Sequence, residues 1–201
     1  MYLNWKKEIK ALESTISSAC YALRSLREEV TLEQLKMVYF ALVESKLRYS
    51  IIFWGNSYKY NIKAAFVLQK RAIRTMLRIP QIESCKEHFR NLGILTVPSL
   101  YILVSLTHLV KNFHKYETYE ERKKRDMTRR KDLKISITPT LNVVRHSTRY
   151  QAIGLFNSLP TSFKTIYCHH KFQNKLKSLL IKKSYYSVDD YLNDKDKLNQ
   201  C

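Results

Sequence analysis

The only Asp-Asp pair in the chain is Asp189-Asp190, in the stretch YYSVDDYL. Paired carboxylates can hold two metal ions about 3.5–4 Å apart and so catalyse phosphoryl transfer. A site of that kind would draw on further acids nearby, but no Asp or Glu lies between Asp132 and Asp189. Ser187 followed by two acids is typical instead of a helix start, where serine caps and acids face the positive helix end. We therefore predict no catalytic residue.

Cysteine and histidine occur together twice, as Cys85-x-x-His88 and as Cys168-His169-His170. Thiolate and imidazole bind zinc, but a structural zinc site needs two spaced pairs, and consecutive residues cannot all point the same way. A buried cysteine with exposed basic histidines is the simpler interpretation. The three glycines are scattered, which excludes a Gly-rich phosphate loop, and no nucleophile elbow is present. We expect no metal ion and no cofactor.

The chemistry that the chain does favour is the binding of anions. Its formal net charge is +19 over 201 residues, and its pI is about 9.8. Such an excess repels itself on folding, so an anionic partner is its natural explanation. Nucleic acid is the first candidate and an acidic membrane surface the second. No apolar run approaches the roughly 20 residues of a membrane span.

The basic residues gather in two windows that contain no Asp or Glu, one between Glu44 and Glu83 and one between Asp132 and Asp189. Solvated helix faces usually mix Glu with Lys because such pairs stabilise the helix, so acid-free windows favour phosphate binding. From these windows and the basic stretch TRRKDL we predict these nucleic-acid-binding residues: Lys59, Lys63, Lys70, Arg71, Arg74, Arg78, Arg129, Arg130, Lys171, Lys175, Lys177, Lys182 and Lys183.

The first set of cations belongs to a predicted helix over 58–79, which ends before Pro80. At about 100° per residue, one face carries the apolar residues Ile62, Ala65, Ala72, Ile73 and Met76. The opposite face carries Lys59, Lys63, Lys70 and Arg74, with Arg71 and Arg78 on its flank. An ordinary solvated face is the alternative.

Apolar periodicity predicts further helices around this one. They are expected over 2–26, 99–116, 149–159 and 169–183, and another should run from a Thr31–Gln34 capping box towards residue 54. In the helix over 99–116, the residues expected to face inward are Leu100, Leu103, Val104, Thr107, Val110 and Phe113. SCKE at Ser84 resembles another capping box, and Gly93 should end the helix that follows. Gly55 is expected to turn a corner in a left-handed conformation, with Asn56 or Ser57 capping the next helix.

These elements predict a mainly α protein: a helical bundle, a charged linker and a small C-terminal helical segment. The expected boundaries are 1–116, 117–148 and 149–201. Scarce turn residues, Gly 3 and Pro 4, agree with few breaks between helices. The stretch KISITPT in the linker has a short strand as its alternative. Four distant cysteines without disulfide spacing favour reduced thiols inside a cell, in the nucleus or the cytoplasm.

Seven stretches of the chain then show a resemblance in order: LNWKKEI, LVESKLRYSIIFWGNS, LQKRAIRTMLRI, SCKEHFRNLGILTVPSLYI, TRRKDL, IGLFNSLP and YYSVDDYL. Together they resemble the C-terminal region of reverse transcriptases from LINE-type (non-LTR) retrotransposons, notably the jockey-like elements of arthropods. The resemblance covers nearly the whole chain. Two departures stand out: the family has Tyr-Gly where this chain has Tyr49-Ser50, and the His and Tyr expected before Thr128-Arg129 are missing.

The resemblance implies a thumb-like clamp that holds template RNA and growing DNA against a polymerase palm. The family's palm aspartates follow an aromatic and one spacer residue, a pattern that Asp189-Asp190 does not match. We therefore expect a palm-less piece of an RNA-directed DNA polymerase that binds nucleic acid without catalysis. The polymerase region of the parent protein would be a further partner, and the oligomeric state is left undetermined.

Two other hypotheses stay open beside the clamp. One is a protein-interaction module, and the other is a relic of a mobile element without function. Aromatics interleaved with bases, as in RYSIIFWGNSYKY, can stack on bases or pack in the core. We expect Phe53 and Trp54 in the core and leave Tyr58 and Tyr60 undecided.

Overall fold

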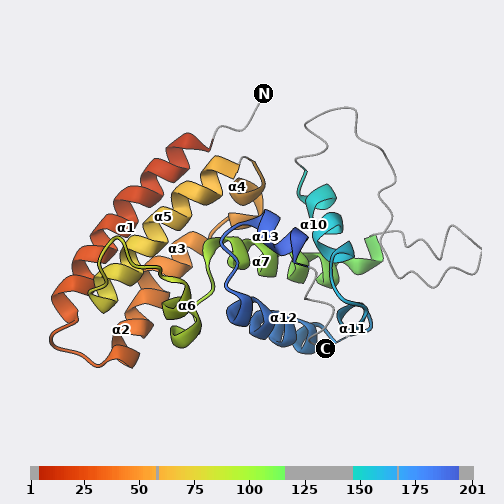
Figure 1. Cartoon of the computed structure of the whole chain (residues 1–201). Helices are drawn as coiled ribbons and strands as arrows, with labels where there is room; N and C mark the ends of the chain where they lie inside the picture. Colours follow the sequence, from red (N-terminus) through yellow and green to blue (C-terminus); the bar gives the residue numbers. More distant parts are fainter. Residues whose placement is uncertain (1–4, 58, 116–146, 167, 195–201) are drawn as a thin grey trace, which may run out of the picture.

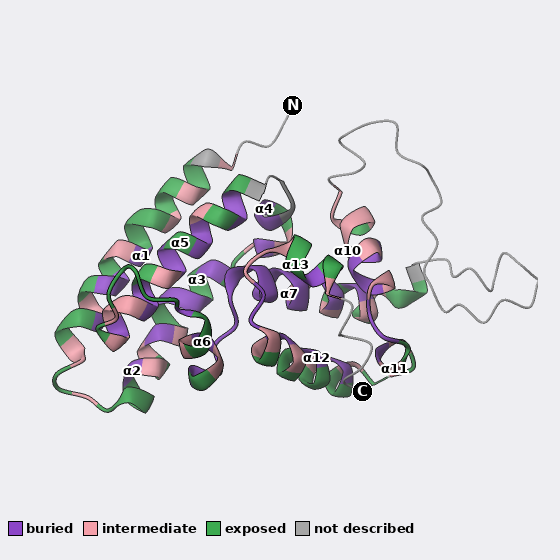
Figure 2. Cartoon of the chain, viewed as in Figure 1, coloured by how far each residue is buried: buried purple, intermediate pink, exposed green. Residues whose placement is uncertain are grey.

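One helix, α7, lies at the centre of the fold, and the other helices pack around it. The computed structural model describes residues 5–57, 59–115, 147–166 and 168–194. Figures 1 and 2 show α7 enclosed by α4, α10, α12 and α13, with most of its residues buried. The mainly α fold class is confirmed, because the described residues form helices and no strand.

The helices follow one another in the order of the chain. They are α1 (Lys6–Leu26), α2 (Leu32–Tyr39), η1 (Phe40–Glu44), α3 (Ser45–Arg48), α4 (Ile51–Ser57), α5 (Lys59–Leu77), α6 (Lys86–Leu92), α7 (Val97–Lys111), η2 (Phe113–Lys115), α10 (Thr148–Asn157), α11 (Thr161–Lys164), α12 (His169–Lys183) and α13 (Val188–Asn193).

The inward face expected for α7 was wrong in part. Leu100 and Leu103 are buried as predicted, but Val104 is only half-buried and Phe113 is exposed. Ile102, Leu106 and Leu109, which were not among the residues expected to face inward, are fully buried. A helix that is apolar on every side is one that neighbours cover on every side. Thr96 caps α7 by accepting the Ser99 backbone N–H, so the helix begins two residues earlier than predicted.

The two long N-terminal helices, α1 and α5, lie side by side (Figure 1). The predicted apolar face of α5 is confirmed, since Ile62, Ala65, Ala72, Ile73 and Met76 are all buried. On α1, Ile16, Ala19 and Leu23 are buried, and the other residues of its stripe pack partly buried against the core. Apolar burial at about 25 cal/mol per Å² holds this pair together.

The helix from α2 to α3 contains a π turn that the sequence did not reveal. The Ser45 backbone N–H donates to the Phe40 carbonyl, five residues back, over η1. Leu35, Tyr39, Val43, Leu47 and Ile51 are all buried and are spaced by four. On a regular α-helix that spacing drifts by about 40° per step, and a wider π turn corrects the drift. The predicted Thr31–Gln34 capping box at the start of this helix is confirmed.

The sharp corner after this helix is at Ser50, and the expectation for Gly55 was wrong. Ser50 has a left-handed φ of 53°, whereas Gly55 lies inside α4. Gly55 serves close packing instead, because a Cβ there would lie 2.8 Å from Cδ2 of the Tyr101 ring on α7. Ser50 stands where the resembling family has glycine, the residue that adopts positive φ without strain.

The early corner also decides which aromatic side chains enter the core. Trp54 is buried as predicted and donates its indole N–H to the Tyr49 carbonyl, at 2.9 Å between Nε1 and O. Phe53 was expected in the core but is 56% exposed, because the helix restarts at Ile51 and turns Trp54 inward. Tyr60 is exposed, and Tyr58 lies outside the described residues.

Two further helix ends follow the sequence closely. Gly93 ends α6 in a left-handed conformation with φ 65°, as predicted. At the start of α6, the hydroxyl of Ser84 accepts the Lys86 N–H, but Glu87 binds Arg90 instead of completing a capping box. Only half of that predicted motif is therefore present.

The C-terminal helices pack against α7. The helix predicted over 169–183 is confirmed as α12, in which Phe172, Leu176 and Leu180 are fully buried and Leu179 is half-buried. Ser187 and Asp190 form a capping box at the start of α13, which confirms their predicted role. The stretch KISITPT lies outside the described residues, and the three predicted domain boundaries stay a prediction.

The side chain of Gln69 ties these parts together. It is fully buried on α5. Its amide nitrogen donates to the Tyr39 hydroxyl at 2.9 Å and to the Leu95 carbonyl at 2.8 Å, and its carbonyl accepts the Val97 N–H at 2.8 Å. The hydroxyl of the adjacent Thr96 donates to the Tyr185 carbonyl at 2.6 Å. The link between α6 and α7 is thereby joined to α2, α5 and the segment after α12.

Within the described ranges, no single helix is both long and apolar enough to cross a membrane. The pair formed by α6 and α7, bent by 51° at its break, reaches that length and composition when taken together.

We predict that Ser50→Gly stabilises the protein. A non-glycine residue in the left-handed region costs about 1–2 kcal/mol, partly offset by the greater freedom of glycine in the unfolded chain. The free energy of unfolding should rise by about 0.5–1 kcal/mol, measured by urea denaturation. Ser184→Gly is the matched control: Ser184 also has positive φ but donates its hydroxyl to the Ile181 carbonyl, so it should gain less. Loss of stability in Ser50→Gly would contradict this assignment.

Stability should also fall at alkaline pH. Burial raises the pKa of Tyr101 to about 12 and raises the pKa of Tyr39 and Tyr191 as well. Because the folded values exceed the unfolded value of about 10, this stability is complete below about pH 10 and is lost as pH rises through the folded values. The urea midpoint should be lower at about pH 11 than at about pH 8, and the difference should be smaller for the Tyr191→Phe variant. Equal midpoints at both pH values would refute the prediction.

Candidate nucleic-acid interface

The cations of α5 are less available than the sequence suggests. Lys63 is exposed and makes no ion pair among the described residues. The Lys70 ammonium lies 4.8 Å from the centre of the Phe66 ring and 5.9 Å from that of Tyr186. A cation over an aromatic face is attracted by the ring quadrupole, so Lys70 has a structural contact. Only Lys63 of these two is free of such contacts.

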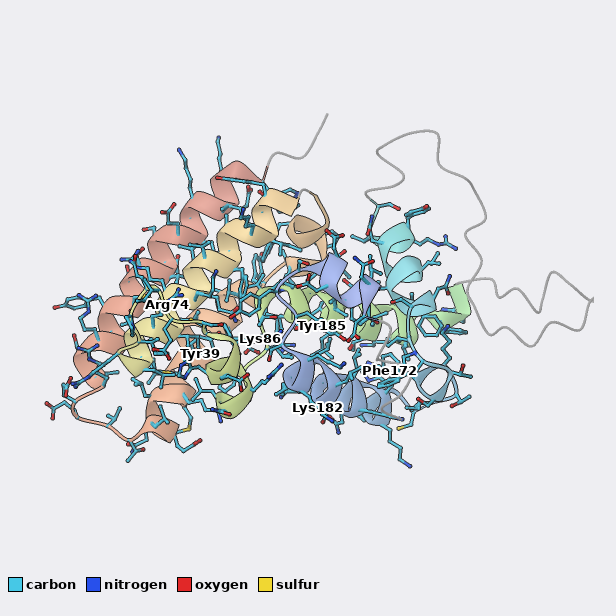
Figure 3. The ribbon with its side chains drawn as sticks, viewed as in Figure 1. Tyr39, Arg74, Lys86, Phe172, Lys182 and Tyr185 are labelled. Carbon is cyan, nitrogen blue, oxygen red and sulfur yellow. The ribbon has the colours of Figure 1, made fainter. Side chains whose placement is uncertain are left out.

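Two arginines of α5, Arg71 and Arg74, and Arg78 just after its end also contact the protein itself. Arg74 donates to the carbonyls of Gln81 and Glu83, each at 3.1 Å, in the loop towards α6 (Figure 3). Arg78 pairs with Glu28 of the loop after α1. Arg71 is exposed, with its Nη1 3.4 Å from the Ser17 hydroxyl. The basic stripe of α5 therefore holds loops and helices together as well as facing solvent.

The cations of α12 are arranged differently. Lys171, Lys175 and Lys182 are exposed and make no ion pair among the described residues. At about 100° per residue they lie within about 40° of one another on the helix surface. Their line is about 16 Å long at 1.5 Å per residue. Lys175 also lies 4.8 Å from the centre of the Phe163 ring. We call these three residues the α12 lysine line.

The two remaining lysines of α12 lie off this line. Lys177 is exposed on the other flank of the helix, and Lys183 lies near the core side. The Lys183 ammonium is 3.1 Å from the Asp194 carboxylate, which accepts the Tyr185 hydroxyl at 2.6 Å. Lys183 thus fastens α13 to α12. An anion bound by Lys177 would therefore lie on the other flank of α12 from the α12 lysine line.

A groove between α6 and α12 continues the α12 lysine line. Its volume is about 650 Å³, and Arg90, Ser178, Ile181, Lys182 and Lys183 line it. Arg90 comes from α6, where its Nη1 is 2.7 Å from Glu87, while its Nε is buried without a hydrogen-bond partner. Figure 3 labels Lys182 on α12 and Lys86 on α6, two helices that contact each other. The groove brings cations from two helices to one hollow.

Sequence reasoning did not select Arg90 or Ser178. Arg90 lies outside both acid-free windows and follows Glu87 by three residues, a spacing typical of a paired surface arginine. Ser178 carries no charge. The packing of α6 against α12 is what places both beside Lys182. No local signal in the chain marks that contact.

Acids are sparse around this surface. Residues 147–188 contain Arg149, Lys164 and the five lysines of α12, but no Asp or Glu. Glu87 and Asp194 are the acids that pair with groove residues, with Arg90 and Lys183 respectively. Lys182 and the rest of the α12 lysine line have no such partner among the described residues. The local field is therefore positive.

Three predicted site residues cannot be placed. Arg129 and Arg130 lie outside the described residues, and the side chain of Lys59 is not described. Lys63 and Lys70 lie on α5, and the α12 lysine line lies on a different helix, so the structure does not bring the two predicted patches into one row.

Of the residues considered for metal binding, His88 and Asp190 have other partners. Among the described residues, no three or more His, Cys, Asp or Glu side chains gather as a metal site would require. His88 binds the Glu83 carboxylate at 2.8 Å, and burial raises the pKa of the Cys85 thiol against the opposing effect of Arg74. The Asp190 carboxylate accepts the backbone N–H groups of Tyr186 and Ser187.

Comparison of the chain with protein-family models, with curated proteins and with solved structures found no match.

We predict that Arg74 is needed for stability more than for binding. Arg74→Gln removes two charge-assisted hydrogen bonds to the loop after α5 and should lower the free energy of unfolding by about 1–2 kcal/mol. The matched control is Lys63→Gln, at an exposed cation on the same helix. This substitution should change the free energy of unfolding by less than about 0.5 kcal/mol. Urea denaturation measures both. Equal effects of the two variants would contradict a structural role for Arg74.

Proposed function

We propose that this chain binds the phosphate backbone of nucleic acids without reading the base sequence. The carrying observation is the α12 lysine line, Lys171, Lys175 and Lys182, exposed and without ion pairs among the described residues. Its length of about 16 Å matches about five phosphates of one strand, at 3.4 Å each. The groove beside Arg90 extends the same positive surface.

The physical mechanism is neutralisation of phosphates with release of bound counterions. Each lysine that replaces a counterion contributes to affinity, and affinity then falls steeply with salt. Lysine ammonium groups act as point charges and do not read base edges in the way that bidentate side chains do. Binding should therefore depend on salt and very little on sequence.

The proposal includes a family origin, on the strength of the seven stretches quoted above. In a reverse transcriptase of a non-LTR retrotransposon, this region would help to hold the RNA–DNA hybrid near a palm. We assign the chain itself no catalytic step. In support, Asp190 of the sole Asp-Asp pair is engaged by two backbone N–H groups at a helix start. An RNA–DNA hybrid is accordingly the first ligand to test.

We predict that the triple variant Lys171→Gln, Lys175→Gln, Lys182→Gln binds nucleic acid weakly. Fluorescence anisotropy would follow a labelled RNA–DNA hybrid and a DNA duplex of unrelated sequences over a range of salt. A plot of log binding constant against log salt concentration has a negative slope. For the duplex, this slope should become less steep by about three, which is about one for each lost contact. The variant should lose affinity for every sequence alike.

The control is the triple variant Lys7→Gln, Lys46→Gln, Lys111→Gln. It removes the same charge from exposed lysines that, within the described residues, also lack ion pairs. It should leave the slope nearly unchanged, because the contacts and not the total charge decide it. The proposal fails if the wild-type chain does not bind the hybrid at low salt or if its binding is independent of salt. It also fails if both triple variants change the salt dependence of binding to the same extent.

A further inference from the structure

A second surface of the molecule combines apolar walls with two lysines, Lys63 and Lys70, that make no ion pair among the described residues. A hollow of about 360 Å³ lies between α5 and the start of α13. Its apolar walls are the side chains of Ile62, Phe66, Val67, Tyr186 and Val188, and Lys63, Lys70, Ser187 and Asp189 complete its lining. Apolar hollows of this size with a few polar groups at the rim are typical of binding sites.

A neighbouring hollow makes the surface larger. It lies between α1 and α5 and has a volume of about 690 Å³. Tyr60 and Leu68 are among its walls, and its charged lining residues are Lys10, Lys63 and Glu13. Lys63 and Val67 line both hollows, so they form a ridge between them. Val67 is 53% exposed and Tyr60 is 70% exposed. Exposed apolar side chains between two hollows mark a surface that gains from being covered.

The charges at the rim determine what can cover it. Within the described part of the chain, neither Lys63 nor Lys70 pairs with a carboxylate, and Lys70 lies over the rings of Phe66 and Tyr186. Two ammonium groups beside apolar walls favour an occupant that carries both carboxylates and apolar side chains.

The polar groups of the hollow are poorly suited to a nucleobase. Ser187 Oγ already accepts the Asp190 N–H at 3.0 Å, and Asp189 already has another interaction. A base is recognised by donors and acceptors that face its edge. A second copy of the chain is also a poor occupant, because two molecules with a formal charge of +19 repel each other.

We infer that this surface binds an acidic amphipathic helix of a partner protein. One apolar side chain would enter the hollow between α5 and α13, another would cross the ridge at Val67, and carboxylates would pair with Lys63 and Lys70. Helices that dock in this way present apolar anchors at positions i, i+3, i+4 and i+7. This inference goes beyond nucleic-acid binding and uses a different helix from the α12 lysine line.

The test uses the full chain and three labelled peptides of about 16 residues each. The first peptide is helical, with leucine at i, i+3, i+4 and i+7 among glutamates. The second replaces the leucines by serine, and the third replaces the glutamates by glutamine. Fluorescence polarisation should show saturable binding of the first peptide and binding at least about tenfold weaker for the other two.

Val67→Glu places a carboxylate in the hollow and should weaken binding of the first peptide at least about tenfold. Its control is Met37→Glu, which changes the charge equally at an apolar side chain that is 64% exposed elsewhere. Lys63→Glu should weaken binding likewise, with the exposed Lys46→Glu as its control. All four positions are exposed, and circular dichroism checks that each variant folds.

Several outcomes would overturn the inference. Equal binding of the leucine and serine peptides would mean that charge alone attracts them. Equal effects of Val67→Glu and Met37→Glu would mean that the hollow is not used. A loss of oligo-dT binding in Val67→Glu, with peptide binding intact, would assign the hollow to nucleobases. The α12 triple variant should keep peptide binding, which separates this result from the nucleic-acid proposal.

Discussion

The buried amide of Gln69 is the interaction on which the arrangement of the helices depends. An amide in an apolar interior is tolerated only when its donors and acceptor are satisfied. Gln69 meets this condition by binding the Tyr39 hydroxyl, the Leu95 carbonyl and the Val97 N–H. It thereby takes up the backbone groups of the extended link between α6 and α7, which lack helical partners of their own. The start of the central helix is fixed by α5.

The link between α6 and α7, which Gln69 holds, also positions the C-terminal helices. Thr96, held between Leu95 and Val97, caps α7 and donates to the Tyr185 carbonyl. Phe172, Leu176 and Leu180 then pack on α7, so the opposite flanks of α12 must face solvent. That geometry exposes Lys171, Lys175 and Lys182. It also brings Lys182 next to Arg90 of α6, and the positive groove results from the packing of the core.

The two basic helices differ because they are packed differently. Helix α5 touches α1, α4 and α7, so its long cationic side chains reach neighbouring loops and rings, as Arg74 and Lys70 do. Helix α12 touches α6 and α7, and much of its surface has no neighbour to bind. The cations of α5 are therefore mostly engaged, whereas Lys171 and Lys182 of α12 have no such contact among the described residues, Lys175 lies over the Phe163 ring and Lys183 pairs with Asp194. The exposed ridge at Val67 remains on α5 as an apolar surface between its cations.

Much of the fold could be predicted from local patterns. The apolar faces of α1, α5 and α12, the capping boxes at Thr31 and Ser187, and the end at Gly93 depend on residues within a few positions of each other. The corner at Ser50, the π turn at Phe40–Glu44 and the exposure of Phe53 could not, because the packing of Tyr101 against Gly55 and the buried row from Leu35 to Ile51 decide them. The candidate interface was half predictable: the lysines of α12 were chosen by charge, and Arg90 was not.

By itself the sequence determined the helical class, the long apolar stripes and the excess of cations, since helix periodicity and charge are properties of neighbouring residues. Only the tertiary structure decided which cations are free. Arg74 and Arg78 bind carbonyl and carboxylate groups of other segments, whereas the α12 lysine line has no carboxylate partner among the described residues, although Lys175 lies over the Phe163 ring. The physical reason is that an ion pair or hydrogen bond forms between groups close in space, and folding brings together residues that are distant in the chain.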